Sequence, residues 1–122
     1  MPVSVLVVDD SAMARKMLIR ALPPDWDIAI TQAANGNQAL AQYRQGGVDV
    51  MFLDLTMPEM DGYQVLETLR SEDLNCLVIV VSADIQEAAQ ERVRAMGACA
   101  FLKKPVEAER IKTVLKEYGL LV

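Results

Sequence analysis

The sequence predicts an α/β fold in which a five-stranded parallel sheet carries helices on both faces. Two observations point to this fold class. Apolar runs of strand length alternate with longer segments of helical period, and the alternation repeats five times along the 122 residues. Three of the runs are apolar almost throughout, as parallel strands covered on both faces should be. Since strand–helix–strand units connect by right-handed crossovers, we expect one three-layered domain over residues 1–122.

The five predicted strands are short runs that are rich in aliphatic side chains. They span residues 3–8 (VSVLVV), 27–33 (DIAITQA), 48–53 (VDVMFL), 76–81 (CLVIVV) and 100–103 (AFLK).

The segments between the strands repeat their apolar residues with the period of an amphipathic helix. One apolar face is formed by Ala14, Met17, Leu18 and Ala21, another by Ile111, Val114, Leu115 and Tyr118, and further helices are predicted over residues 37–45, 62–70 and 85–96. The helix over residues 85–96 has a thin stripe of partly small residues. We therefore expect it to be the least firmly docked helix.

Capping residues agree with these boundaries. Ser11 is placed to cap the first helix, and the Pro23–Pro24 pair closes it. Gly46–Gly47 ends the second helix. Asp84, followed three residues later by Glu87, predicts a capping box for the fourth.

Composition and charge argue against several function classes. The net charge is −5, and no cluster of Lys and Arg is long enough to follow a phosphate backbone, so nucleic-acid binding is not expected. The first apolar stretch is too short for a signal or membrane segment, which predicts a cytoplasmic protein. Cys76 and Cys99 have no CxxC spacing and no His to complete a metal site. We interpret them as small buried hydrophobes.

Charged and polar residues stand at the carboxyl ends of four predicted strands. Asp9–Asp10 follow the first strand, Asp54 the third and Ser82 the fourth, and Lys103–Lys104 lie at the end of the fifth. Functional residues of an open parallel sheet gather at this edge, so these side chains should meet there. Each one also has an ordinary interpretation, as a turn residue, a helix cap or a solvated strand end. Their coincidence on four strands favours a site.

The chemistry of such a site follows from its charges. Carboxylate pairs about 5 Å apart repel one another by about 1 to 3 kcal/mol, so three of them together require a compensating cation or raised pKa values. Oxygen ligands and the absence of His from the chain favour Mg²⁺ over zinc. A lysine and a hydroxyl aimed at the same point would stabilise a phosphoryl group. Asp54 would then be the nucleophile that forms an acyl phosphate.

Four stretches closely resemble the receiver domain of bacterial two-component response regulators, and the single-domain length resembles the chemotaxis-type regulators. They are VLVVDDS, FLDLTMPEMDGYQVL, VIVVSAD and GACAFLKKPV, and the resemblance covers essentially the whole chain. It implies a flavodoxin-like receiver fold with strand order 2-1-3-4-5.

The resemblance also implies a role for each matching residue. Asp54 matches the phosphoacceptor, and Asp9 and Asp10 match the acidic pair that binds Mg²⁺, for which Mn²⁺ is a substitute. Asp54 itself and the backbone carbonyl of Thr56 match the remaining protein ligands of the metal. Ser82 matches the switch hydroxyl and Phe101 the aromatic switch. Lys104 matches the family's lysine, which leaves Lys103 a bystander, and a cis peptide is expected at Lys104–Pro105.

The implied function is a signalling switch rather than an enzyme. The phosphoryl group would come from a histidine kinase or a histidine phosphotransfer protein and be transferred to Asp54. Ser82 would then move toward it, and Phe101 would turn inward. These movements would change the surface formed by the fourth helix, fifth strand and fifth helix, which an unknown protein target would bind. For Phe101, plain core packing is the alternative. Asp61, Met57 and Met60 are interpreted as loop and packing residues.

Four positions stand out against the commonest pattern of the family. Val106 stands where an aromatic residue is frequent, and the switch aromatic is Phe rather than Tyr. Thr56 and Asp84 occupy positions that tune access of the attacking water, which leaves the lifetime of the phosphoryl group open. Capping the fourth helix is an equal alternative for Asp84.

Other functions on a similar sheet remain as alternatives. A phosphorelay intermediate or a phosphate sink would use the same site. An aspartyl-phosphate phosphohydrolase favours Asp-x-Asp after a strand, where this chain has Asp54 followed by Thr56, and a cap domain has no room in 122 residues. A flavodoxin-type flavin carrier needs a phosphate loop after the first strand, but DDSAMAR is acidic there.

Overall fold

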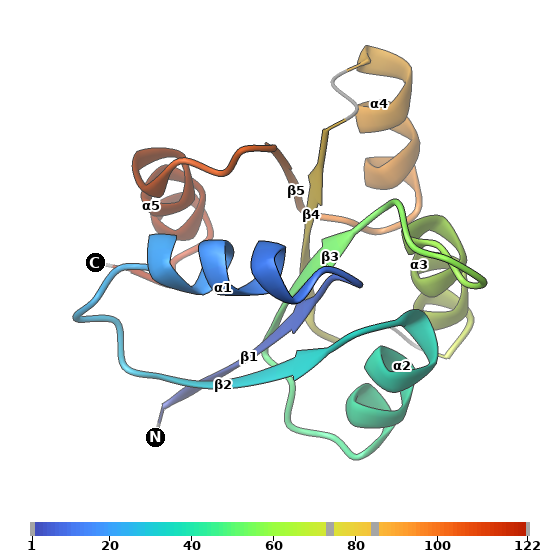
Figure 1. Ribbon diagram of the computed structural model, residues 1–122, viewed down its shortest axis with the longest axis horizontal. Helices are drawn as coiled ribbons and strands as arrows, with labels where there is room; N and C mark the ends of the chain where they lie inside the picture. Colours follow the sequence, from blue (N-terminus) through green and yellow to red (C-terminus); the bar gives the residue numbers. More distant parts are fainter. Residues whose placement is uncertain (1, 73–74, 84–85, 122) are drawn as a thin grey trace.

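A five-stranded parallel sheet in the order β2-β1-β3-β4-β5 forms the centre of the molecule. The computed structural model describes residues 2–72, 75–83 and 86–121. Figure 1 shows β2 and β5 at the two edges of the sheet and helices on both faces. The predicted fold class and strand order are confirmed.

Strands and helices alternate strictly along the chain. The strands are β1 (Val3–Val8), β2 (Ile28–Ala33), β3 (Val50–Asp54), β4 (Leu77–Ser82) and β5 (Ala100–Lys103). The helices are α1 (Ala12–Ala21), α2 (Gly36–Arg44), α3 (Gly62–Ser71), α4 (Glu87–Ala95) and α5 (Ala108–Glu117).

The boundaries that were predicted differ from these by up to two residues. For α5 only an apolar stripe beginning at Ile111 was predicted, and the helix itself begins at Ala108. Its polar first turn carries no apolar signal. Strand β3 begins two residues later than predicted and continues through Asp54, so the candidate acceptor is itself the last residue of the strand.

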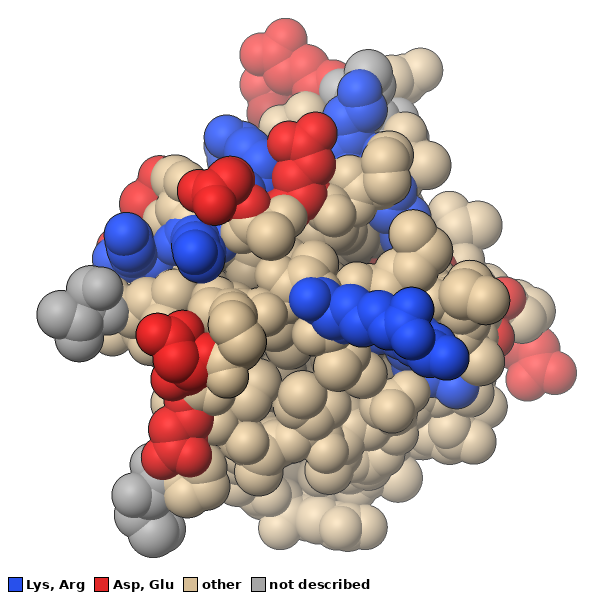
Figure 2. Space-filling view, turned by 60° about the vertical axis from the view of Figure 1, so that its left-hand side comes forward, with Lys and Arg blue, Asp and Glu red and all other residues tan. Residues whose placement is uncertain are grey.

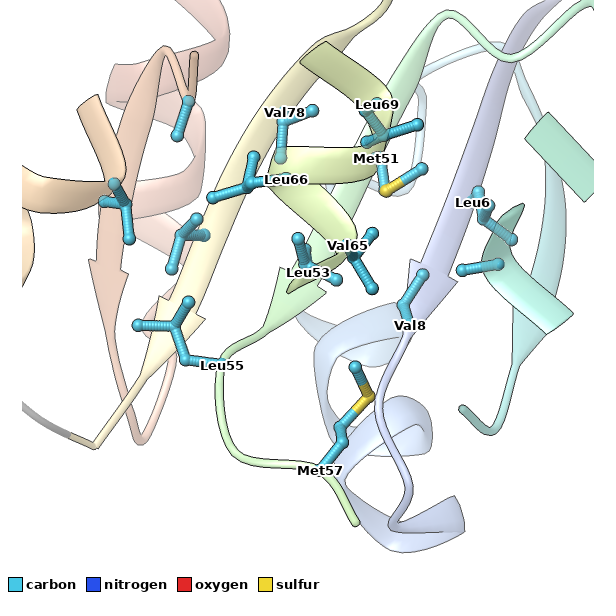
Figure 3. Packing of buried hydrophobic residues seen from close by; sticks show 14 of the residues in the cluster. Leu6, Val8, Met51, Leu53, Leu55, Met57, Val65, Leu66, Leu69 and Val78 are labelled. Atoms are coloured by element: carbon cyan, nitrogen blue, oxygen red, sulfur yellow. The ribbon is translucent and has the colours of Figure 1, made fainter. Parts of the chain in front are cut away.

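Two separate hydrophobic clusters hold the helices to the sheet. Helices α1 and α5 share one cluster with inward-facing residues of the strands, and α2, α3 and α4 share the other. Figure 3 shows the second cluster, where Val65, Leu66 and Leu69 of α3 lie against side chains of β3 such as Leu53. These side chains are fully buried, so the end of β3 rests on a rigid base.

Most predicted helix ends are confirmed. The Ser11 hydroxyl accepts a hydrogen bond from the Ala14 amide at 3.1 Å, and α1 ends at Ala21, so that its C-cap Leu22 stands directly before Pro23. Helix α2 is followed by Gly46 at a φ of 85°, in the left-handed region. Helix α4 begins after Gln86, whose side chain forms no capping hydrogen bond. The predicted capping residue Asp84 lies outside the described residues.

The two cysteines are only partly buried, so the prediction that they are buried hydrophobes was wrong in degree. Both still pack against a core cluster. Burial raises the pKa of the Cys76 thiol to about 11, and burial also raises the pKa of Cys99. Both thiols therefore stay protonated and unreactive at neutral pH.

Charged side chains of both signs are scattered over the face shown in Figure 2, around a broad uncharged area. Among the helices that the structure describes, none has both the length and the apolar character that a membrane span requires.

Candidate functional site

Three carboxylates lie together at the carboxyl edge of the sheet. Asp9 and Asp10 follow β1, Asp54 ends β3, and each offers an oxygen within 4.8 Å of the others. Asp9 is 6% exposed and Asp54 is 5% exposed, whereas Asp10 faces solvent. The structure thus brings together the acidic residues that the sequence predicts at this edge.

Lys104 reaches the acidic cluster from the end of β5. Its Nζ lies 2.8 Å from Asp9 Oδ2 and 3.3 Å from Asp54 Oδ1. Its backbone amide donates to the Ser82 carbonyl at 2.9 Å, which ties the ends of β4 and β5 together, and the Lys104–Pro105 peptide is cis as expected. Lys103 is exposed, so Lys104 is the lysine of the site.

Asp9 is held from three directions. Lys104 binds one carboxylate oxygen, and the Ser11 amide donates to the other at 2.9 Å. Arg15 Nη1 donates to the Asp9 carbonyl at 2.5 Å, while Arg15 Nε donates to Gln32 Oε1 at 2.9 Å. Arg15 was not among the predicted site residues, because nothing in its spacing along the sequence marks it as a neighbour of Asp9.

The site holds more negative charge than its lysine offsets. Burial raises the pKa of Asp54, and the nearby charge of Asp9 raises it further, against the opposing effects of Lys104 and of the Thr56 amide. Burial alone would lower the pKa of Lys104, but its contacts with Asp9 and Asp54 leave that pKa raised. A further cation would therefore favour the ionised form of Asp54.

Ser82 and Thr56 border a cavity that is also lined by Leu55, the residue directly after Asp54. Ser82 is only 2% exposed at the end of β4. The cavity has a volume of about 260 Å³, and its walls are formed by Leu55, Thr56, Met57, Asp61, Tyr63 and Ser82. Space therefore lies next to the hydroxyl at which a switch motion is predicted.

Phe101 already lies inward in this structure. It is 8% exposed and belongs to the core cluster on the α2–α4 face. The predicted inward turn of this ring therefore has little distance left to cover.

The loop between β3 and α3 is fixed by Gly62. Its amide donates to the Leu55 carbonyl at 2.9 Å. A Cβ at this position would lie 2.5 Å from the Asp54 carbonyl oxygen and 2.7 Å from the Leu55 Cα, both of which belong to the backbone. Only glycine allows α3 to begin this close to the residue that carries the candidate acceptor.

Asp61, which the sequence analysis placed among loop and packing residues, has a definite structural role. Its side chain accepts from the Gln64 amide, and the Gln64 side chain accepts from the Asp61 amide, both at 2.9 Å. This capping box starts α3. The pair Asp61 and Gln64, directly before an apolar stripe, was the sequence signal that could have revealed it.

A second, larger cavity of about 420 Å³ lies on the other side of the site, between α1 and the segment after β5. Asp9 and Lys104 border it together with mostly apolar side chains, among them Met17 and Val106. Val106, one of the departures from the family pattern, is half-buried against the core that α1 and α5 share.

Comparison with known proteins identifies the family. The model of the response regulator receiver domain matches residues 5–116. This chain belongs to that family. The resemblance seen in the sequence is thereby confirmed, together with the fold that it implied.

The relatives of this receiver domain include chemotaxis proteins and larger regulators. It is 34% identical to the chemotaxis protein CheY of Bacillus subtilis, with 88% of this chain and 89% of the relative aligned. It is also 37% identical to a protein-glutamate methylesterase/protein-glutamine glutaminase of Halalkalibacterium halodurans, of which it spans only 35%.

Solved structures agree with this assignment. The CheY chain in a CheX–CheY–BeF₃–Mg²⁺ complex from Borrelia burgdorferi superposes with a TM-score of 0.88 at 31% identity, over 97% of this chain and 90% of that one. The receiver domain of NarL from Mycobacterium tuberculosis gives a TM-score of 0.85 at 33% identity, over 97% of each chain.

Proposed function

We propose that this receiver domain is a phosphorylation-controlled switch in which Asp54 accepts a phosphoryl group from a phosphohistidine. The donor would be a histidine kinase or a histidine phosphotransfer protein. The single observation that carries the proposal is the placement of Asp54. It is a buried carboxylate at the end of a central strand, with Asp9, Asp10 and Lys104 gathered around it.

In the proposed step, a carboxylate oxygen of Asp54 attacks phosphorus, and a new O–P bond forms. The N–P bond of the phosphohistidine breaks, and its electron pair returns to the imidazole nitrogen. Lys104 is placed to offset charge on the phosphoryl oxygens, since its Nζ lies 3.3 Å from Asp54 Oδ1. The Ser82 hydroxyl would donate a hydrogen bond to the transferred group.

The donor set of the site fits Mg²⁺. Asp9, Asp10 and Asp54 offer oxygens within 4.8 Å of one another, the surplus negative charge favours a cation, and the exposed position of Asp10 leaves room for water ligands. The Thr56 backbone carbonyl is the proposed fourth protein ligand. When bound, Mg²⁺ would neutralise phosphoryl oxygens and the acidic cluster. Mn²⁺ has the same preference for oxygen ligands and would substitute.

The response would reach a partner through the surface formed by α4, β5 and α5. Ser82 ends β4 and would move toward the phosphoryl group, and Phe101 would act as the second switch residue. Since the Phe101 ring already packs in the core, its part would be to hold the switched state rather than to start the change. The complex of the Borrelia burgdorferi neighbour with CheX supports a protein as the partner.

Relay to a further histidine, or service as a phosphate sink, would use the same chemistry at Asp54. Activity as a phosphohydrolase is not favoured, because the family and the fold are those of receiver domains. We propose that the chain catalyses no reaction beyond its own phosphorylation and slow dephosphorylation.

The proposal is tested by intact mass after incubation with acetyl phosphate, with and without Mg²⁺. We expect the wild type to gain one phosphoryl group only with the metal, and Asp54→Ala to gain none. Lys104→Met and Lys103→Met form a matched pair. Lys104→Met should slow phosphoryl incorporation at least tenfold and Lys103→Met should leave its rate unchanged, because of these two lysines it is Lys104 that contacts Asp54. An undiminished gain in Asp54→Ala would assign the acceptor elsewhere.

A further inference from the structure

Helix α4 is attached to its neighbour α3 by two arginines. The Arg92 guanidinium of α4 stacks over the Tyr63 ring of α3, with Cζ 3.9 Å from the ring centroid. In the other direction, Arg70 Nη1 of α3 donates to the Ala95 carbonyl of α4 at 3.0 Å. The apolar attachment is slight, because Ala89 and Val93 are the buried residues of the helix. These two contacts therefore carry much of the connection between the helices.

Tyr63 connects α4 with the phosphorylation site. It lies in the first turn of α3, half-buried against the core, and it borders the cavity of about 260 Å³ that Ser82 and Thr56 also border. Phe101 is not among the residues that line this cavity. Space released by a movement of Ser82 thus opens toward the Tyr63 ring.

We propose that Arg92 and Tyr63 form a latch that holds α4 against α3 and is weakened when Asp54 carries a phosphoryl group. This inference rests on the proposed function. Movement of Ser82 toward Asp54 enlarges the cavity, the Tyr63 ring moves into the new space, and the ring leaves the guanidinium. Because Arg70 still holds the Ala95 carbonyl, α4 pivots about its C-terminal end and its N-terminal turns are displaced.

The latch makes a thermodynamic prediction. A contact present only in the unphosphorylated state opposes binding of any ligand that favours the other state. Removing an exposed cation–π contact should therefore raise the affinity for a phosphoryl analogue by about two- to fivefold. A contact that is equally strong in both states would leave the affinity unchanged.

The test measures the affinity for beryllofluoride, a phosphoryl analogue, by calorimetric titration in the presence of Mg²⁺. Arg92→Met keeps the aliphatic stem of the side chain and removes its charge. Arg94→Met is the matched control, since Arg94 is exposed on the same helix and its side chain makes no contact that the structure records among the described residues. We expect tighter binding in Arg92→Met and wild-type binding in Arg94→Met.

Two variants of the ring separate a latch from a general loosening of the fold. Tyr63→Phe keeps the aromatic face and should bind beryllofluoride like the wild type. Tyr63→Leu removes the face, so adding Arg92→Met to it should change the affinity no further. Hydrogen exchange of the α4 amides without ligand should be about two- to fivefold faster in Arg92→Met than in Arg94→Met.

The outcomes distinguish the two proposals. No metal-dependent binding of beryllofluoride by the wild type would overturn the proposed function, and the latch with it. Binding by the wild type with equal or weaker binding by Arg92→Met would overturn the latch alone. An additional gain from Arg92→Met in the Tyr63→Leu background would also overturn it, because the arginine would then act through another group.

Discussion

Helices α3 and α4 follow adjacent strands and leave the same edge of the sheet, but they are attached in very different ways. Helix α3 starts with a capping box at Asp61, is pressed against β3 through Gly62, and buries Val65, Leu66 and Leu69 completely. Its C-terminal end is tied to α2 by two hydrogen bonds between Arg44 and Glu72. Helix α4 receives no capping hydrogen bond from the side chain of Gln86, the described residue before it, and it has two buried residues and the two arginine contacts to α3.

The difference separates two tasks within one layer of the domain. The carboxylate proposed to accept the phosphoryl group must be held in one geometry, and the loop that follows its strand leads into the firmly packed helix. A surface that changes on phosphorylation needs two states of similar free energy, which a lightly packed helix provides. The firm region therefore supports the chemistry and the loose region supports the proposed response.

The largest expected effect tests this comparison directly. Leu66→Ala should lower the free energy of unfolding by about 3 to 4 kcal/mol, because Leu66 is fully buried between α3 and the sheet. Val93→Ala in α4 removes a smaller side chain from the helix that we expect to be more weakly docked. It should cost about 1 to 2 kcal/mol and should show mainly as faster hydrogen exchange within α4.

Urea denaturation and hydrogen exchange on the same samples make this measurement. The comparison is wrong if Val93→Ala costs as much global stability as Leu66→Ala, or if the amides of α4 exchange as slowly as those of α3 in the wild type. Either result would mean that the two helices unfold as one unit.

A smaller effect is expected at the start of α3. Gly62→Ala places a Cβ against the backbone at Asp54 and Leu55, neither of which can move without shifting β3. We expect a loss of about 2 kcal/mol in the free energy of unfolding. Phosphoryl gain from acetyl phosphate should also be slower, because the end of β3 at Asp54 is displaced.

Gly36→Ala is the control for Gly62→Ala. A Cβ at Gly36 lies 2.8 Å from the side chain of Met60, which is flexible and can turn away. Its cost should be at most half that of Gly62→Ala, and its rate of phosphoryl gain should match the wild type. Equal costs at the two glycines would show that the β3–α3 loop is more compliant than its contacts indicate.

Much of this arrangement could be predicted from sequence, because the information lies in local patterns. Apolar runs predict the five strands, and the rule that functional residues gather at the carboxyl edge predicts that Asp9, Asp54 and Lys104 lie together. The strand order came from the resemblance to receiver domains, since periodicity does not specify which strands are neighbours.

The remaining features depend on contacts between residues that are distant in sequence. Arg15 reaching the Asp9 carbonyl and Arg92 stacking on Tyr63 are results of packing, with no local signature. The burial of Phe101 is likewise a property of the assembled core. The capping box at Asp61 was different, because its spacing was visible in the sequence and was interpreted as a loop.

The smallest expected effect, a gain in stability, concerns the charge at Asp54. Burial and the neighbouring Asp9 raise the pKa of Asp54 in the folded state, so this carboxyl stabilises the fold only where it is protonated. That stability is fully present below the unfolded pKa of about 3.9 and is lost as the pH rises through the raised native pKa. At pH 7 without metal, Asp54→Asn should therefore be more stable than the wild type, by less than the loss expected for Gly62→Ala.

Thermal and urea unfolding of wild type and Asp54→Asn between pH 4 and pH 7 would measure the difference in their free energies of unfolding. This difference should shrink as the pH falls, and it should also shrink when Mg²⁺ is added at pH 7. Since Asp54 belongs to the firmly packed region, the gain should appear as slower exchange in β3 and α3, while α4 continues to exchange through its own local opening. If Asp54→Asn is less stable than the wild type at pH 7, the favourable contact with Lys104 outweighs the unfavourable effects of burial and of repulsion from Asp9 on the ionised Asp54. The firmly packed region would then stabilise its acceptor carboxylate even without a metal.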